Sequence, residues 1–240
     1  MDKIYIGFLL FMILCSGTSV RQKDKVLIFS KTTRYHHESI PDGIKAIVKL
    51  GQQNNFEVDA TTDSGAFTAE NLKKYKAIIF LSTSGNNLLD TVQKTCLVNY
   101  IKSGGGFVGI HSASASEKNW PWYGKLIGAV FTDHPEPQFG NILVTNTKDP
   151  STKHLPKIWK WKDEWYNFIK ISTKVNVLLC AEEASYTGGK HGKYHPLAWT
   201  QRYDGGRVFY TALGHFSEAY SDTLFLRHLQ GGINFALGKK

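Results

Sequence analysis

Three histidines stand next to short apolar runs that lie far apart in the sequence. His37, His111 and His215 each close such a run or follow it within a few residues. An imidazole titrates near neutral pH, so it can donate or accept a proton, and its neutral form binds metal ions. The pattern indicates a polar site assembled from distant segments, provided that the apolar runs are strands of one sheet.

The apolar runs alternate with segments of helical periodicity. The expected strands are Lys25–Ser30, Phe56–Ala60, Ala77–Leu81, Gly106–His111, Val175–Ala181, Leu197–Gln201 and Arg207–Thr211. Helices are expected from Ser39 and Pro41 to about Gly51, over Leu88–Ser103 and over Asp222–Leu237. This alternation predicts an α/β fold, a parallel sheet with helices on both faces.

The second half of the chain is less regular and rich in aromatic residues. Trp120, Trp159 and Trp165 belong to stretches typical of long loops with short strands, and Asp204-Gly205 marks a hairpin turn. We find no internal repeat and no low-complexity linker. The sequence therefore predicts one domain over residues 25–238.

Ligands of open α/β sheets bind outside the carboxyl ends of the strands. This rule makes His36 and His37, the segment Thr83–Asn87, His111 and His215 candidates for a pocket. Gly109-Ile110-His111-Ser112 runs from a strand into a turn of small residues, in the manner of a nucleophile elbow. The alternative is that His111 is a buried, hydrogen-bonded core residue.

Six segments together resemble a known family. They are His36–Ile40, Gly109–Ser112, Gly128–Pro135, Asp163–Tyr166, Pro196–Trp199 and Gly206–His215. In this order they resemble the ThuA-like (trehalose utilisation) family, from about Lys25 to Gly238. The resemblance implies a flavodoxin-like sheet of the class I glutamine amidotransferase type. It also implies that His111 stands where those amidotransferases keep their catalytic cysteine, so glutamine hydrolysis is not expected.

The same resemblance implies a set of site residues. The residues expected to carry the chemistry are His37, His111, His134, Glu164 and His215, and the adjacent Glu38-Ser39 favours His37 over His36 as the family histidine. Those expected to contact the substrate are Trp120 and Tyr166 as walls, Ser112, and His195 at the rim. The alternative for His134 is an ordinary loop histidine, and the alternative for Glu164 is a loop carboxylate that caps a nearby backbone group.

Two chemistries are compatible with such a set. Imidazoles and a carboxylate can act as general acid and base on a sugar, whose rings would stack on the aromatic loops. Alternatively, two or three histidines with Glu164 can hold a divalent metal. No tight ligand spacing such as HExxH occurs, so the sequence assigns no residue as a metal ligand and leaves the cofactor open.

The first twenty residues have the features of an export signal. Lys3 precedes an apolar run from Ile4 to Leu14, which is too short to span a bilayer, and small residues follow. We therefore expect residues 1–20 to be a signal peptide and the protein to be secreted, periplasmic or in the cell envelope. A membrane contact is expected only if Cys15 is lipidated.

The charge pattern does not indicate nucleic acid. The net charge is +9, but the lysines are spread along the chain without a basic and aromatic stripe. The expected partner is a small carbohydrate, and the oligomeric state is not readable from the sequence. The leading hypothesis is an enzyme acting on a disaccharide or keto-sugar, a hydrolase or a lyase. The alternatives are a non-catalytic sugar-binding module and a metal-dependent hydrolase of another small molecule.

Overall fold

A computed structural model describes residues 23–239. The expected signal peptide and Cys15 lie outside the described residues. The strands are β1 (Asp24–Phe29), β2 (Phe56–Thr61), β3 (Ala77–Leu81), β4 (Gly106–Ile110), β5 (Val130–Asp133), β6 (Gln138–Val144), β7 (Ile158–Asp163), β8 (Asn167–Ile169), β9 (Asn176–Glu182), β10 (His195–Tyr203) and β11 (Gly206–Thr211). The α-helices are α1 (Ile40–Gln53), α2 (Ala69–Leu72), α3 (Thr91–Lys102), α4 (Pro121–Ile127) and α5 (Thr223–Leu237).

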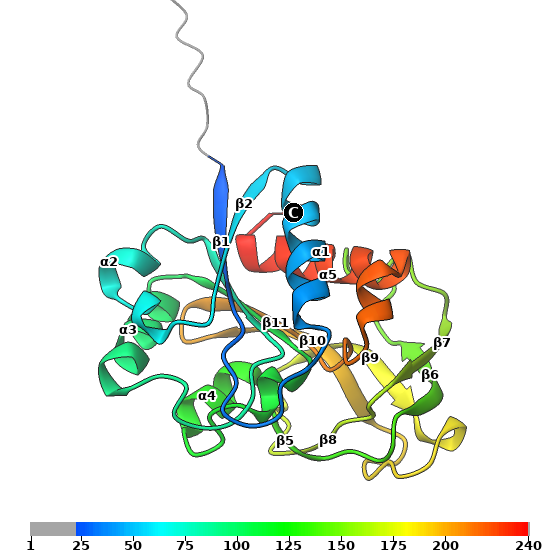
Figure 1. Ribbon diagram of the computed structural model, residues 1–240. Coiled ribbons are helices and arrows are strands. Elements are labelled where there is room, and N and C mark those ends of the chain that lie inside the picture. The colour runs from blue at the N-terminus through cyan, green and yellow to red at the C-terminus, as the bar shows by residue number, and fades with distance from the viewer. Residues whose placement is uncertain (1–22, 240) are drawn as a thin grey trace, which may run out of the picture.

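Nine of these strands form one mixed sheet in the order β2-β1-β3-β4-β11-β10-β9-β6-β7. The first five are parallel to one another, and the other four continue the sheet in antiparallel pairs (Figure 1). The predicted α/β fold is confirmed. In the region expected to hold long loops with short strands, the stretch around Trp159 forms the edge strand β7, in which every second side chain packs inward while the lysines face outward.

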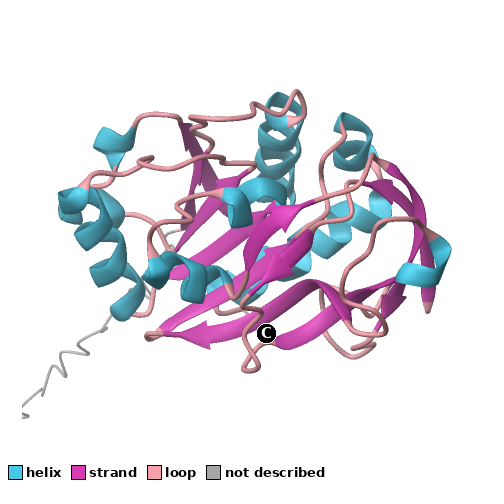
Figure 2. Cartoon of the chain, turned by 90° about the horizontal axis from the view of Figure 1, so that it is seen from below, coloured by secondary structure: helices cyan, strands magenta, loops and turns pink. Residues whose placement is uncertain are grey.

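The helices cover both faces of the sheet, and strand order explains which helix lies where (Figure 2). From β1 the chain moves through α1 to β2, and then from β2 through β3 to β4 it moves in the opposite direction. Because crossovers between parallel strands are right-handed, this reversal puts α1 on one face and α3 on the other. Helix α5 contacts α1 and packs on the same face, over β4 and β11.

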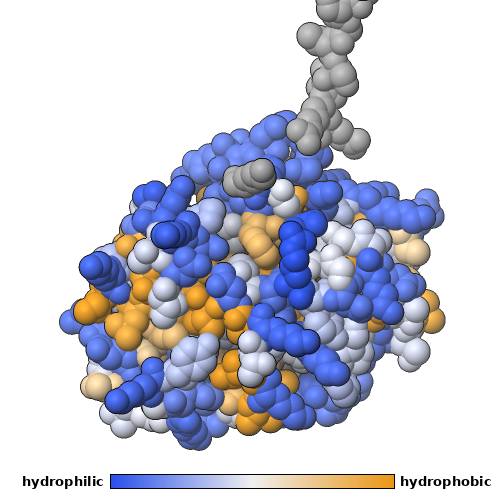
Figure 3. Space-filling view, turned by 180° about the vertical axis from the view of Figure 1, so that it is seen from behind, coloured by the Kyte–Doolittle hydropathy of each residue, from blue (hydrophilic) through white to orange (hydrophobic). Residues whose placement is uncertain are grey.

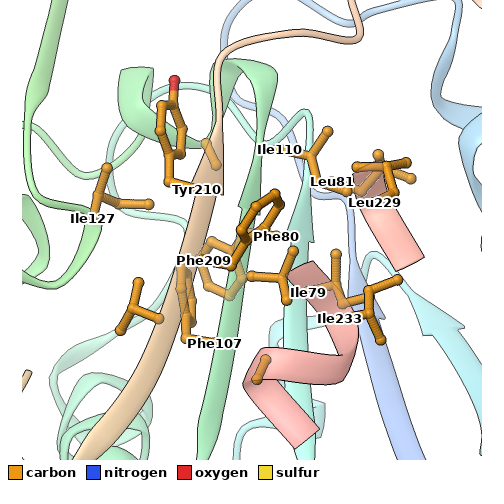
Figure 4. Close-up of a cluster of buried hydrophobic side chains, with 14 of the residues drawn as sticks. Ile79, Phe80, Leu81, Phe107, Ile110, Ile127, Phe209, Tyr210, Leu229 and Ile233 are labelled. Carbon is orange, nitrogen blue, oxygen red and sulfur yellow. The ribbon is translucent and has the colours of Figure 1, made fainter. Parts of the chain in front are cut away.

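The core lies between α5 and the central parallel strands. Ile79 of β3 and Phe209 of β11 lie near Leu229 and Ile233 of α5, and all four are fully buried (Figure 4). Strands covered on both faces read as continuous apolar runs rather than alternating ones. This is why β1, β3 and β4 were recognisable in the sequence.

The surface mixes polar and apolar side chains. On the face opposite to that of Figure 1, hydrophilic residues predominate and hydrophobic ones gather toward one side (Figure 3). Within residues 23–239, none of the helices combines the length and the apolar character needed to cross a bilayer.

His228 gives the fold a pH-dependent stability that can be measured. It is buried in α5, where Nδ1 donates to the Ser151 carbonyl at 2.9 Å and Nε2 lies 3.2 Å from the Thr211 hydroxyl. Burial lowers the pKa of His228 to about 4. The unfolded chain, in which the histidine has a pKa of about 6.5, takes up the proton first as the pH falls, so this stabilisation is complete above that pH and is lost toward pH 4.

We expect this residue to remove up to about 1.4 kcal/mol of stability per pH unit in that window. His228→Asn should be less stable than the parent protein at pH 7, and the difference should shrink at pH 5. Denaturant unfolding of both proteins at the two pH values measures this. Parallel pH profiles would contradict the prediction.

Candidate functional site

A cavity of about 670 Å³ opens at the carboxyl ends of the parallel strands. It lies near the end of β1, which has β2 on one side and β3 on the other. The chain passes from β1 to β2 and then crosses back to β3, so the strand order reverses here, and open α/β sheets bind ligands at such a topological switch point. Its lining comes from the segments after β1, β3, β4, β7 and β11 and from the β5–β6 region: Arg34, Tyr35, His37, Ser84, Gly85, Asn86, Ser112, Ala115, Lys118, Phe131, His134, Glu136, Pro137, Glu164, Tyr166 and His215.

His111 lies on a sharp turn after β4, beneath residues that line the cavity, and does not line it itself. Its φ is +53°, a left-handed conformation that is uncommon for a residue with a side chain. The turn has the character expected of an elbow, with a fully buried imidazole where such elbows carry a nucleophile. Nδ1 donates to the Ala212 carbonyl at 2.7 Å, which leaves Nε2 to face the other polar groups.

Three side chains meet around this Nε2. Together with His111 they form what we call the histidine–carboxylate cluster: His37, His111, Glu164 and His215. One donor atom from each lies within 4.8 Å of all the others. Nε2 of His111 stands 3.0 Å from Nε2 of His37 and 3.4 Å from Nδ1 of His215. Oε2 of Glu164 lies 3.3 Å from both His111 Nε2 and His215 Nδ1. The structure therefore brings together residues that are up to 178 positions apart (215 minus 37).

A buried carboxylate, Asp163, holds two members of the cluster in place. Its Oδ1 accepts from the backbone N–H groups of Glu164 at 2.9 Å and His215 at 3.2 Å. Its Oδ2 accepts from the Gly214 N–H and the Trp161 indole N–H. Asp163 thus fixes the end of β7 against the segment after β11, although no basic side chain within residues 23–239 pairs with it.

The charges of the cluster follow from burial and from its own members. Burial lowers the pKa of His37 to about 2, and repulsion from His111 and His215 acts in the same direction. Burial opposes ionisation of Glu164, but hydrogen bonds and charge from His111 and His215 outweigh it and hold the pKa well below its usual range. Burial also disfavours a charged His215, yet Glu164 raises its pKa. The cluster therefore presents a neutral His37 beside an ionised Glu164.

Tyr166 and His134 border the cluster on the cavity side. The Tyr166 hydroxyl lies 2.9 Å from His111 Nε2, and burial, followed by the Glu164 charge, raises its pKa well above the ordinary value. It therefore stays a hydrogen-bond donor. His134 Nε2 lies 3.3 Å from Oε1 of Glu164, and the His134 side chain is 34% exposed. Its Nδ1 donates to the Pro135 carbonyl at 2.9 Å, so Nε2 is the nitrogen that can exchange a proton with the carboxylate or with a ligand in the cavity.

Trp120 and His195, which were expected at the ligand, lie elsewhere. Trp120 does not line the cavity. It caps α4, and its ring stacks on Trp122 and Tyr123 beside a different cleft. His36, as expected, is not the site histidine, since it is exposed and its Nδ1 pairs with the Thr32 hydroxyl.

His195 is not a rim residue but a fully buried one behind Tyr166. Its Nε2 donates to the Tyr166 carbonyl at 2.7 Å, and its Nδ1 lies 2.7 Å from Oε1 of Glu183 and 2.9 Å from the Tyr186 hydroxyl. Because both ring nitrogens are engaged away from the cavity, His195 supports the position of Tyr166 and does not touch a ligand there.

The structure also places at the site two residues that the sequence did not single out. Tyr35 is 62% exposed at the cavity, packs edge-on against His37 with ring centroids 4.7 Å apart, and its carbonyl accepts from the Ser84 hydroxyl. Tyr35 directly precedes His36 and His37 in the sequence, and this position is the signal by which it could have been identified. Asp163 stands in the recognised Asp163–Tyr166 segment, where Glu164 drew attention instead.

This arrangement can do two kinds of chemistry. Imidazoles, a carboxylate and a phenol at hydrogen-bond distance can relay protons, and the converging nitrogen and oxygen atoms can also hold a cation. Among the described residues, the cavity lining includes no cysteine, and the free thiols Cys96 and Cys180 lie outside it. A thiol nucleophile of the amidotransferase type is therefore missing from this position.

The sequence profile of the ThuA family, described as trehalose utilisation, matches residues 25–236. The chain belongs to this family, which implies a role in trehalose utilisation or carbohydrate metabolism. No curated protein matches the sequence.

Solved structures agree with this assignment. A ThuA-like protein from Bacteroides uniformis is 28% identical, with a TM-score of 0.75 over 89% of this chain and 91% of the other. A ThuA-like protein from Parabacteroides merdae is 20% identical, with a TM-score of 0.69 over 90% and 91%. A GMP synthase protein from Thermoplasma acidophilum, 10% identical with a TM-score of 0.55 over 90% and 95%, shares the fold alone. The fold is of the class I glutamine amidotransferase type.

Proposed function

We propose that this protein is an enzyme that acts on a disaccharide or keto-sugar outside the cytoplasm. The observation that carries the proposal is the convergence of the histidine–carboxylate cluster at the base of a 670 Å³ cavity, which has room for a small sugar. Family membership supports a carbohydrate as the substrate class. The leader-like first twenty residues support the location.

Aromatic rings at the cavity suit a sugar ring. Tyr35 exposes most of its side chain at the mouth, and Phe131 and Tyr166 pack together deeper, with centroids 4.3 Å apart. The apolar faces of a pyranose can pack on such rings while its hydroxyls meet polar groups such as Asn86 and Ser112. The lining thus combines apolar and polar contacts.

The proton-transfer groups are placed around the expected reacting centre. His134 and Glu164 form one path, since His134 reaches Oε1 of the carboxylate and is accessible from the cavity. Tyr166 supplies a hydrogen-bond donor to oxygen that gains negative charge during hydrolysis or elimination. His111 is fully buried, and with Nδ1 fixed by Ala212 its Nε2 faces Tyr166 and Glu164, which line the cavity.

A binding and turnover screen tests the proposal. The protein is screened by thermal shift against disaccharides and their keto derivatives, and each hit is incubated and assayed for products by mass spectrometry. A ligand at a hundredfold excess over its Kd stabilises the native state by about 2.7 kcal/mol, which the screen detects. Tyr35→Ala should weaken binding about five- to tenfold, as expected for a lost aromatic contact of about 1 kcal/mol.

Tyr194→Ala is the matched control, because Tyr194 is 60% exposed but does not line the cavity. Binding without any product after long incubation would replace the enzyme by a sugar-binding module. No binding to any of these sugars would reject the substrate class.

A further inference from the structure

Four of the six separations within the histidine–carboxylate cluster match those of a metal coordination sphere, and the other two do not exceed 4.8 Å. Bonds of about 2.0–2.1 Å place neighbouring ligand atoms about 3.0 Å apart in octahedral and about 3.4 Å apart in tetrahedral coordination. The separations around His111 Nε2 are 3.0, 3.3 and 3.4 Å, and that between Glu164 and His215 is 3.3 Å. Ordinary packing of side chains does not require four donor atoms to converge in this way.

The nitrogen of His111 faces several polar groups at once. Because Nδ1 of His111 donates to a backbone carbonyl, Nε2 carries a lone pair in the neutral ring. Besides the Tyr166 hydroxyl at 2.9 Å, this lone pair faces Oε2 of Glu164 at 3.3 Å in a buried environment. A cation between the nitrogen and the carboxylate oxygen would be attracted to both.

Surrounding groups orient the cluster as they do in metal sites. Ala212 fixes the His111 ring, and the Ser112 hydroxyl lies 3.4 Å from Nδ1 of His37, so Nε2 of each ring turns inward. Asp163 fixes the backbone of Glu164 and His215. Such supporting hydrogen bonds set the tautomer and direction of metal-ligating histidines.

We infer that the histidine–carboxylate cluster binds one divalent transition-metal ion. The donor atoms are Nε2 of His37 and of His111, Nδ1 of His215 and Oε2 of Glu164. Three imidazoles and one carboxylate suit zinc, manganese, iron, cobalt or nickel, whereas calcium and magnesium prefer oxygen ligands throughout. With neutral imidazoles the cluster carries one negative charge, which a dication converts to a net single positive charge.

The inference deepens the proposed function, because the ion would face the same cavity. Metal binding stands by itself, whereas a catalytic use of the ion rests on the proposed function. A dication there polarises a sugar oxygen or a bound water. Tyr166 and His134 stay outside the donor set and keep the proton-transfer roles described above. The sequence offered no local ligand motif because each donor comes from a different loop.

Metal titration tests this inference apart from turnover. The protein, purified without a histidine tag, is stripped with EDTA, dialysed and titrated calorimetrically with Zn²⁺, Mn²⁺ and Co²⁺. We expect one equivalent to bind at low micromolar Kd or tighter for at least one ion. Bound Co²⁺ should give visible absorption bands typical of nitrogen and oxygen ligands. His111→Asn and Glu164→Gln should each weaken binding about 100-fold or more.

His36→Ala is the matched control, since His36 neighbours a ligand but points away from the cluster. Its affinity should equal that of the parent protein. Binding of none of the ions, or equal binding by the parent and by folded Glu164→Gln, would overturn the inference. Turnover by the metal-free protein would overturn the catalytic use of the ion and leave the proposed function standing. Metal binding without turnover of any sugar would support the metal site and overturn the proposed function.

Discussion

His111→Asn is expected to lower turnover of the sugar substrate by about 10²–10⁴-fold, the size of loss expected when proton-transfer groups lose their arrangement. The substitution removes the nitrogen around which the cluster is arranged, with four polar atoms within 3.4 Å. Asparagine is chosen because it tolerates the left-handed backbone that His111 adopts at φ +53°. A steady-state assay with the sugar identified by the screen measures the effect.

His228→Asn is the control for this prediction. His228 is also a fully buried histidine with both ring nitrogens near protein groups, but it lies under α5 and away from the cavity. It should lose stability and keep its turnover, whereas His111→Asn should lose turnover while circular dichroism shows an intact fold. Full turnover by His111→Asn would refute its role and support the alternative that it is a structural core residue.

The parallel half of the fold was predictable because its signals are local. Strands buried on both faces, such as Ala77–Leu81, are continuous apolar runs, and the helices between them keep their period. The antiparallel half was harder. β6 and β7 have one face toward solvent, so lysines such as Lys160 and Lys162 interrupt the apolar pattern and resemble a loop. Their pairing depends on contacts between segments, which composition does not reveal.

The site was predictable to the extent that strand ends identify it. His37, His111 and His215 follow parallel strands, and the rule for open sheets places them together. Trp120 was misplaced because an aromatic residue in a loop can face either of two clefts, and its stacking partners decide which. His195 was misplaced because its hydrogen bonds to Glu183 and to the Tyr166 carbonyl bury it.

Asp163 carries the second large prediction, as a positioning residue. Each of its oxygens accepts two N–H groups, and two of these four belong to the backbone of Glu164 and His215. Asp163→Asn keeps the shape but replaces one oxygen by an amide that donates, so two N–H donors lose their acceptor and face another donor. We expect a loss of about 2–4 kcal/mol in unfolding free energy, since each unpaired buried donor costs about 1–3 kcal/mol.

The substitution should also change the site itself. Because Glu164 and His215 would shift, metal affinity should fall about 10–100-fold and kcat should fall with little change in KM. Trp161→Phe is the matched control. It removes one N–H from the same carboxylate without touching the backbone of Glu164 or His215. This variant should lose about 1 kcal/mol of stability but keep its metal affinity and kcat. If both variants changed metal affinity and kcat equally, Asp163 would be a general stabiliser of the fold. A selective loss in Asp163→Asn would instead show that this buried carboxylate sets the geometry at which two cluster residues meet.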